Sequence, residues 1–280
     1  MSFPFFPPDD DPGPSFAALL ERTGYTPTVP TEKLEGVTHG TTVIAIRYGD
    51  GVVMAGDRRA TSGHLISHRT MEKVYPADRH SGVAIAGAAG PAMEMVKLFQ
   101  LQLEHYEKVE GSELSLEGKA NQLSQMVRSH LPAAMQGMAV VPLFAGYDVR
   151  RRAGRLFQYD VTGGRYEEAD FATTGSGSLH AGTVIKIGYR QDMNREQTLD
   201  LAIQALFQAA DEDSATGGPD LVRGIYPTMA TITGNGFEHV TEDEVAQRFR
   251  GLLDRLSTPE STATTGAAPS MTTGAGGNDR

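Results

Sequence analysis

One stretch near residue 40 constrains the fold of this chain more than any other. His39-Gly40-Thr41-Thr42 leads into an apolar run that is β-branched at 41–44 and again at 46. No strand-breaking residue follows until the sequence Gly49-Asp50-Gly51, which is typical of a hairpin turn. The pattern therefore predicts a strand over 41–48, a tight turn, and a second strand over 52–57.

Composition narrows the classes of function. The chain has 280 residues, 39% hydrophobic and 21% charged, which is enough for one large or two ordinary domains with a packed core. The formal net charge of −10 disfavours nucleic acid and anionic membranes as partners. The sequence has no cysteine, so it offers no thiol chemistry and fits a reducing cytoplasm. No apolar run reaches about 18 residues, so we expect no membrane span.

Motifs for metals and cofactors are also missing. His64 and His68 are four residues apart, but neither a helical pattern nor a glutamate accompanies them, so no zinc site is expected. Gly175-Ser176-Gly177 lacks the third glycine of a dinucleotide fingerprint, and Leu179 stands where a serine-hydrolase elbow would have its last glycine. We therefore expect no cofactor.

Both ends of the chain differ from the middle. Residues 1–40 hold seven of the fifteen prolines, and six acidic residues there face only two basic ones. Such a segment cannot bury enough apolar area to fold alone. It is interpreted either as a disordered tail or as a removable pro-segment that ends at Gly40. Residues 257–280, rich in Ser, Thr, Gly and Ala, are expected to be disordered.

The middle of the chain, 41–256, has the patterning of a compact domain. After an irregular section up to Pro76, further strands are expected around 82–87, 138–147, 155–160, 165–167 and 221–233. Helices are expected at about 91–108, 115–131, 178–188 and 195–211, and a last one after a capping box of Thr241 and Glu244. Helix pairs that alternate with groups of strands predict an α+β fold with two antiparallel sheets covered by helices, a four-layer αββα sandwich.

Three residues stand at positions that suggest chemistry. Asp57 closes an apolar strand, Lys73 lies in Met71-Glu72-Lys73-Val74-Tyr75 with apolar residues on both sides, and Gly87 ends a buried strand. Taken singly, each has an ordinary explanation: a strand-end ion pair, a lysine whose stem is buried, and a turn glycine.

Cleavage of the chain after Gly40 would give these three residues a common role. Thr41 would then carry a free α-amine, with an ordinary pKa of about 8, beside its own hydroxyl, so that one residue supplies both base and nucleophile. A lysine held by an acid would keep the local potential positive, and a backbone N–H would stabilise the oxyanion. Asp57, Lys73 and Gly87 are the residue types that those roles require.

Several motifs in this order and spacing resemble proteasome β-subunits, most closely those of actinobacteria, over about 41–256. The motifs are Gly40-Thr41-Thr42, Gly56-Asp57-Arg58-Arg59-Ala60-Thr61, Lys73, Ile85-Ala86-Gly87, Thr174-Gly175-Ser176-Gly177-Ser178 and Asp213-Ser214-Ala215-Thr216-Gly217-Gly218. The resemblance implies an N-terminal-nucleophile hydrolase, a threonine endopeptidase that removes residues 1–40 by self-cleavage between Gly40 and Thr41.

The resemblance also implies roles for single residues. Thr41 would be the nucleophile, Asp57 and Lys73 its supporting pair, and the Gly87 N–H the oxyanion donor. Ser176 and Asp213 match residues around the threonine amine, and Thr216 stands where many relatives carry serine. Thr61 and Ala89 match positions whose backbone pairs with substrate. The residues implied to line an apolar specificity pocket, suited to large apolar side chains, are Ala60, Met71, Ile85, Ala89 and Met93.

The partners that the resemblance implies are those of a proteasome core. The β-subunits would form seven-membered rings stacked with rings of α-subunits, and an ATPase ring would feed unfolded substrates tagged by a small ubiquitin-like modifier. Two alternatives remain. One is the two-ring bacterial heat-shock peptidase, which shares the Gly-Asp and Gly-Ser-Gly features but needs no α-subunit. The other is a catalytically silent ring subunit, although such subunits typically lose the threonine or the lysine.

Overall fold

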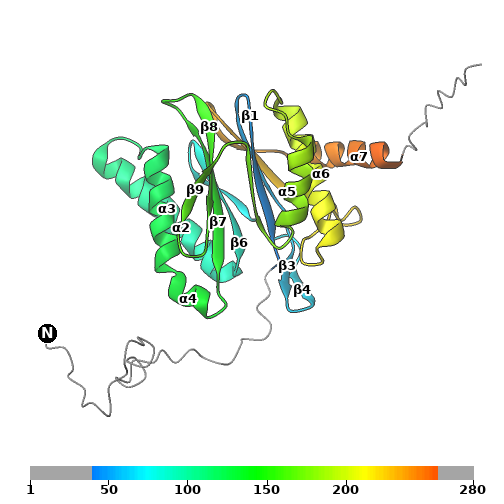
Figure 1. The fold of residues 1–280 in the computed structure, drawn as a ribbon, viewed down its shortest axis with the longest axis horizontal. Coiled ribbons are helices and arrows are strands. Elements are labelled where there is room, and N and C mark those ends of the chain that lie inside the picture. Colours follow the sequence, from blue (N-terminus) through cyan, green and yellow to red (C-terminus); the bar gives the residue numbers. More distant parts are fainter. Residues whose placement is uncertain (1–39, 258–280) are drawn as a thin grey trace, which may run out of the picture.

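The computed structural model describes residues 40–257. The expected pro-segment, apart from Gly40, lies outside the described residues, and so does the expected C-terminal tail after Ser257. Ser257 itself is the last residue of a helix, so the tail cannot begin there as expected. Elements are labelled as in Figure 1.

Two five-stranded antiparallel sheets form the middle of the molecule. The first has the strand order β10-β1-β2-β11-β12, and the second has the order β5-β6-β7-β8-β9. The strands of the first sheet are β1 Thr42–Tyr48, β2 Gly51–Gly56, β10 Phe171–Gly175, β11 Thr228–Thr233 and β12 Gly236–His239. Those of the second are β5 Val74–Asp78, β6 Ser81–Gly87, β7 Val140–Asp148, β8 Ala153–Tyr159 and β9 Arg165–Glu168. A separate hairpin pairs β3 Ala60–Ser62 with β4 Leu65–His68.

Helices cover the outer face of each sheet. Figure 1 shows α2 and α3 beside the second sheet, and α5 and α6 beside the first. The helices are α2 Ala89–Glu110, α3 Leu116–Ser129, α4 Leu131–Met135, α5 Ser178–Gly188, α6 Arg195–Glu212 and α7 Glu242–Ser257. The order of layers is helix, sheet, sheet, helix, which confirms the four-layer α+β sandwich.

The apolar run of β1 continues without alternation because both faces of the strand are buried. Val43 and Ala45 belong to the core between the two sheets, together with Ala84 and Leu143 of the second sheet. Ile44 and Ile46 point the other way, into the core under α5 and α6. Side chains alternate across a strand, so a strand with two apolar environments needs apolar residues at every position.

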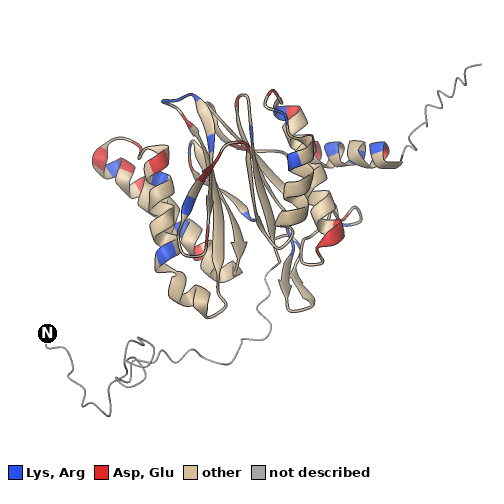
Figure 2. Cartoon of the chain, in the orientation of Figure 1, with Lys and Arg blue, Asp and Glu red and all other residues tan. Residues whose placement is uncertain are grey.

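Charged residues are spread differently from apolar ones. Figure 2 shows most Lys, Arg, Asp and Glu on the helices and at the loop ends of the strands, with the middle of the sheets largely free of charge. None of the helices in the described part of the chain is long and apolar enough to cross a membrane.

The structure corrects several sequence-based expectations. The section up to Pro76 is not irregular, because it contains the β3–β4 hairpin and β5. The strand expected over 221–233 is confined to β11, since 221–224 form a turn in which Val222 is 93% exposed. The Thr241 hydroxyl does accept the Glu244 N–H, at 3.3 Å. The Glu244 carboxylate, however, pairs with Arg195 and Arg248.

Candidate active site

Thr41 lies at the entrance of β1, where the chain enters the fold. The residue is only 4% exposed. Its hydroxyl Oγ1 donates a hydrogen bond of 2.8 Å to the carbonyl oxygen of Gly40. Its backbone N–H, which is an amide in the uncut chain, donates to Ser176 Oγ at 3.3 Å. The side-chain oxygen of Thr41 is therefore held against the peptide group that the sequence marks as the cleavage site.

Asp57 and Lys73 form a buried ion pair beside this residue. Asp57 follows β2 directly, Lys73 precedes β5, and the distance from Lys73 Nζ to Asp57 Oδ1 is 2.7 Å. Lys73 Nζ also donates to the backbone carbonyl of Arg59 at 2.6 Å. Burial lowers the pKa of Lys73, and the negative charge of Asp57 opposes this shift. The pair thus holds a desolvated cation whose proton is easier to remove than that of an ordinary lysine.

The carboxylate of Asp57 is fixed by backbone groups from three segments. Thr42 N donates to Oδ1 at 2.8 Å, while Arg59 N and Gly217 N donate to Oδ2 at 2.9 and 2.8 Å. Together with Lys73, the fully buried carboxylate receives four hydrogen bonds. Four hydrogen bonds leave the carboxylate little freedom to move.

A second network lies on the other side of Thr41. Ser176 Oγ and Thr216 Oγ1 both donate to Asp213 Oδ2, at 2.5 and 2.6 Å. Burial by itself would raise the pKa of Asp213, but the hydrogen bonds from Ser176 and Thr216 outweigh it and lower the pKa. Asp213 is therefore an anion that orients Ser176 toward the backbone nitrogen of Thr41.

Two glycines allow the chain to approach Thr41 and to turn beside it. At Gly175, φ is +102°, and a Cβ atom there would lie 1.8 Å from the carbonyl oxygen of Thr41. At Gly87, φ is +118°, and a Cβ atom would lie 2.0 Å from the carbonyl oxygen of Ala139. Only glycine fits either position, because both the space and the backbone conformation exclude a side chain.

A small cavity opens at Thr41. The residues that line it are Gly40, Thr41, Ala60, Met71, Lys73, Ile85, Gly87, Ala89 and Ala92. It therefore brings together the residues expected to be the nucleophile, its supporting lysine and the oxyanion donor, with four of the five expected pocket residues. Met93 is the exception: it is 42% exposed, and its neighbour Ala92 faces the cavity instead. Thr61 lies close by, since its Oγ1 accepts the N–H of Gly40 at 3.2 Å.

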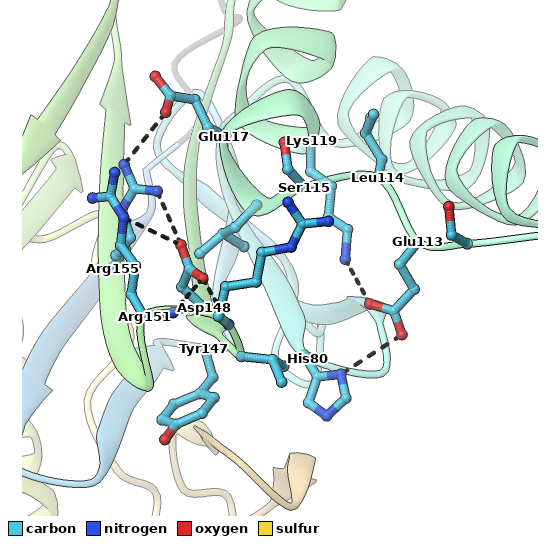
Figure 3. Close-up of a pocket in the computed structure, with 14 residues that line it drawn as sticks. His80, Glu113, Leu114, Ser115, Glu117, Lys119, Tyr147, Asp148, Arg151 and Arg155 are labelled. Carbon is cyan, nitrogen blue, oxygen red and sulfur yellow. Dashed lines mark hydrogen bonds and ion pairs between the residues drawn. The ribbon is translucent and has the colours of Figure 1, made fainter. Parts of the chain in front are cut away.

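A second, more strongly charged pocket lies elsewhere, between the β7–β8 turn and the start of α3. Figure 3 shows two of its cations paired with anions: Lys119 with Glu113 at 3.1 Å, and Arg155 with Asp148 at 3.3 Å. None of the expected site residues lines it. Among residues 40–257, no cluster of three or more histidine, aspartate or glutamate side chains is arranged to hold a metal ion.

Sequence reasoning missed two groups at the site. In the sequence, Thr42 stands out only as part of the expected strand and of the motif Gly40-Thr41-Thr42, yet its hydroxyl contacts Thr216 Oγ1 at 2.6 Å. Gly217 supplies a backbone N–H to Asp57, and a loop glycine gives no signal of that role in the sequence. Thr42 is fully buried in the strand, and a buried hydroxyl needs a hydrogen-bond partner. A hydroxyl residue inside an apolar strand was therefore the one sequence signal for a role of Thr42.

Comparison with known proteins places this arrangement in one family. A sequence model of that family, described as proteasome subunit, matches residues 37–222. The proteasome subunit beta of Acidimicrobium ferrooxidans is 56% identical over 247 residues, which cover 86% of this chain and 90% of that protein. The corresponding protein of Streptomyces griseus is 60% identical over 217 residues, 78% of this chain and 77% of that protein. That of Jonesia denitrificans is 52% identical over 241 residues, 84% and 80% of the two chains.

The match covers both halves of the site, from Gly40 to Gly217, and the fold around it is the four-layer sandwich expected for such proteins. The chain therefore belongs to the proteasome subunit family, and within it to the β-subunits.

Proposed function

We propose that this chain is the peptide-hydrolysing β-subunit of a 20S proteasome core, with Thr41 as its nucleophile. The observation that carries the proposal is the position of Thr41 Oγ1. It donates to the Gly40 carbonyl oxygen at 2.8 Å and lines a small cavity together with Lys73 and Gly87. The same residue is held on its other side by Ser176 and Asp213.

The first reaction is self-cleavage. Thr41 Oγ1 attacks the carbonyl carbon of Gly40, the C–N bond breaks, and the hydroxyl proton ends on the departing nitrogen. The product is an ester between Gly40 and Thr41 Oγ1 together with a free α-amine. Water then hydrolyses the ester and releases residues 1–40. Until that step Thr41 has no free amine, which keeps the uncut chain inactive as a zymogen.

The second reaction uses the liberated amine. With an ordinary pKa of about 8, the α-amine accepts the proton of Thr41 Oγ1 as the oxygen attacks a substrate carbonyl. Lys73, fixed by Asp57, favours the deprotonated states of both groups through its charge. The Gly87 N–H donates to the oxyanion, and the Ser176–Asp213 pair orients the amine. Water hydrolyses the resulting acyl ester. No metal or cofactor takes part in this scheme.

The apolar side of the cavity supports the proposed substrate preference. Its lining residues Ala60, Met71 and Ile85 are apolar, which supports a preference for an apolar side chain before the cleaved bond, and the resemblance implies that this side chain is large. Thr61 and Ala89 would hold the substrate backbone. The proposed setting is the one implied by resemblance: cytoplasmic heptameric β rings between α-subunit rings, supplied by an ATPase ring with tagged, unfolded proteins.

The test is hydrolysis of a fluorogenic peptide with a large apolar residue before the cleaved bond, by particles co-assembled with the α-subunit. Wild type is expected to be active, Thr41→Ser weakly active and Thr41→Ala inactive, with equal amounts of assembled particle. Full activity in Thr41→Ala would exclude Thr41 as the nucleophile. Assembled but inactive wild-type particles would support the alternative of a silent ring subunit.

A further inference from the structure

The hydroxyl of Thr42, the residue after the proposed nucleophile, connects three segments of the site. Thr42 is fully buried. Its Oγ1 lies 2.6 Å from Thr216 Oγ1 and accepts the N–H of Gly177 at 3.0 Å. Its own backbone N–H donates to Asp57 Oδ1. One small side chain thus links the start of β1 to the loops that carry Ser176 and Asp213.

Counting protons fixes the direction of these hydrogen bonds. Each hydroxyl has a single proton to donate. Thr216 donates its proton to Asp213 Oδ2, so it can only accept in its contact with Thr42. Thr42 must therefore donate to Thr216. The chain of donors runs from Gly177 N–H through Thr42 and Thr216 to the Asp213 carboxylate.

Hydrogen bonds that point the same way strengthen one another, and the last acceptor here is an anion. The Asp213 oxygen that ends this chain also receives the hydroxyl of Ser176. Ser176 in turn contacts the nitrogen of Thr41. The orientation of Thr42 is therefore transmitted to the nitrogen that becomes the catalytic amine.

We propose that Thr42 is a positioning residue for the reaction at Thr41, acting through the directed chain Thr42–Thr216–Asp213–Ser176. The inference rests on the proposed function and adds a residue to it. Thr42 does not touch the substrate, so its loss is expected to slow the chemical step without weakening substrate binding. If the hydroxyl only filled buried space, its loss would not slow the chemical step selectively while leaving substrate binding unchanged.

The test compares Thr42→Val, which keeps the shape and removes the hydroxyl, with Thr42→Ser, which keeps the hydroxyl. A control is Thr198→Val, because Thr198 is also fully buried and donates its hydroxyl to a backbone carbonyl, that of Asn194, within α6. All variants are co-assembled with the α-subunit, and kcat, KM, melting temperature and the extent of self-cleavage are measured on the assembled particles.

Thr42→Val is expected to lower kcat roughly tenfold, the loss expected from one hydrogen bond, with KM unchanged. Thr42→Ser is expected to stay within about twofold of wild type, and Thr198→Val to keep wild-type kcat even if its melting temperature falls. Wild-type kcat in Thr42→Val overturns the inference, as does an equal loss of kcat in Thr198→Val. Inactive wild-type particles instead overturn the proposed function itself.

If Thr42→Val does not assemble, Thr216→Val interrupts the same chain from outside β1. The same loss of kcat at constant KM in Thr216→Val supports the chain, and a wild-type kcat overturns it. Thr216→Ser keeps the donor and is the matched control for that pair.

Discussion

Within residues 40–257, two lysines are almost fully buried, and their surroundings differ in kind. Lys73 pairs with the single carboxylate of Asp57 and donates to a backbone carbonyl. Lys119 pairs with two carboxylates, Asp78 at 2.5 Å and Glu113 at 3.1 Å. Lys73 also has the like charge of Arg59 nearby, which lowers its pKa further.

The difference separates a charge used for chemistry from a charge used for structure. Lys119 is paired with two carboxylates, so negative charge is in excess around it. Lys73 is desolvated and matched by one anion only, so its positive charge remains available to groups at the cavity that it lines with Thr41. A buried cation with a single partner at a cavity is a candidate for function, whereas one inside a network of partners is a candidate for stability.

The largest expected effect comes from removing each lysine in turn. Lys73→Met is expected to lower peptide hydrolysis at least about 100-fold and to slow self-cleavage, because the potential that favours the deprotonated nucleophile is lost. Lys119→Met is expected to cost roughly 1–3 kcal/mol of stability, since it leaves Asp78 and Glu113 without their cation, and to keep activity per assembled particle. Peptide hydrolysis and urea unfolding measure the two effects. Equal losses of activity in Lys73→Met and Lys119→Met would contradict the distinction between a catalytic and a structural lysine.

The next effect concerns two glycines, one beside Thr41 and one beside the charged pocket. Gly175→Ala forces a Cβ atom against the carbonyl of Thr41 at a positive φ, and is expected to cost more than about 3 kcal/mol and to block self-cleavage. Gly111, beside the charged pocket, also has a positive φ, but a Cβ atom there meets nothing within 4 Å. Gly111→Ala is expected to cost only about 1 kcal/mol, with normal cleavage. Urea titration measures the stability of both variants, and intact mass measures their self-cleavage. A Gly111→Ala chain that fails to cleave itself would contradict the account.

A smaller effect is expected from the acids. Asp213→Asn weakens the acceptor that orients Ser176 and is expected to lower kcat roughly tenfold. Glu113→Gln, in the charged pocket, is the control and is expected to leave kcat unchanged. The measurement is the kinetics of peptide hydrolysis. A wild-type kcat in Asp213→Asn would show that the Ser176–Asp213 pair does not support the amine.

The smallest effect is a dependence of stability on pH. Burial lowers the pKa of Lys73 in the folded chain below its ordinary value of 10.5. At a pH between the folded-state pKa and 10.5, the unfolded chain therefore holds a proton that the folded chain lacks. Stability contributed by this residue therefore rises with pH through that window and is complete above 10.5. Urea unfolding of wild type and Lys73→Met at several pH values measures it. Parallel curves for the two proteins would contradict the shift.

The sequence revealed the core strands better than the edges. β1, β2, β6 and β7 lie between two apolar layers, so their residues form unbroken apolar runs that are easily recognised. The sequence did not predict the β3–β4 hairpin, because Leu65–His68 is exposed at every position and has no regular alternation of apolar and polar residues. The opposite error occurred at residues 221–227, where a strand was predicted but none forms. Leu221 and Val222 are apolar, yet they are exposed on a turn.

The site shows the same division. Roles could be assigned to Asp57 and Lys73 because the motif Gly56-Asp57-Arg58-Arg59-Ala60-Thr61 and Lys73 match a known family in order and spacing. Thr42 could not be assigned a role in that way, because its partner Thr216 is 174 positions away and only the packing of the fold brings the two hydroxyls together. Backbone donors such as Gly217 N leave no trace in residue type at all.

The central claim is that Thr41 cuts the bond that precedes it, and mixed particles test it most directly. Wild-type chains and Thr41→Ala chains of distinguishable mass are co-assembled with the α-subunit, and both are analysed by intact mass and N-terminal sequencing. The account predicts that every wild-type chain begins at Thr41, while Thr41→Ala chains in the same particle keep residues 1–40. Wild-type chains that keep residues 1–40 in complete particles, or Thr41→Ala chains cut after Gly40, would contradict it.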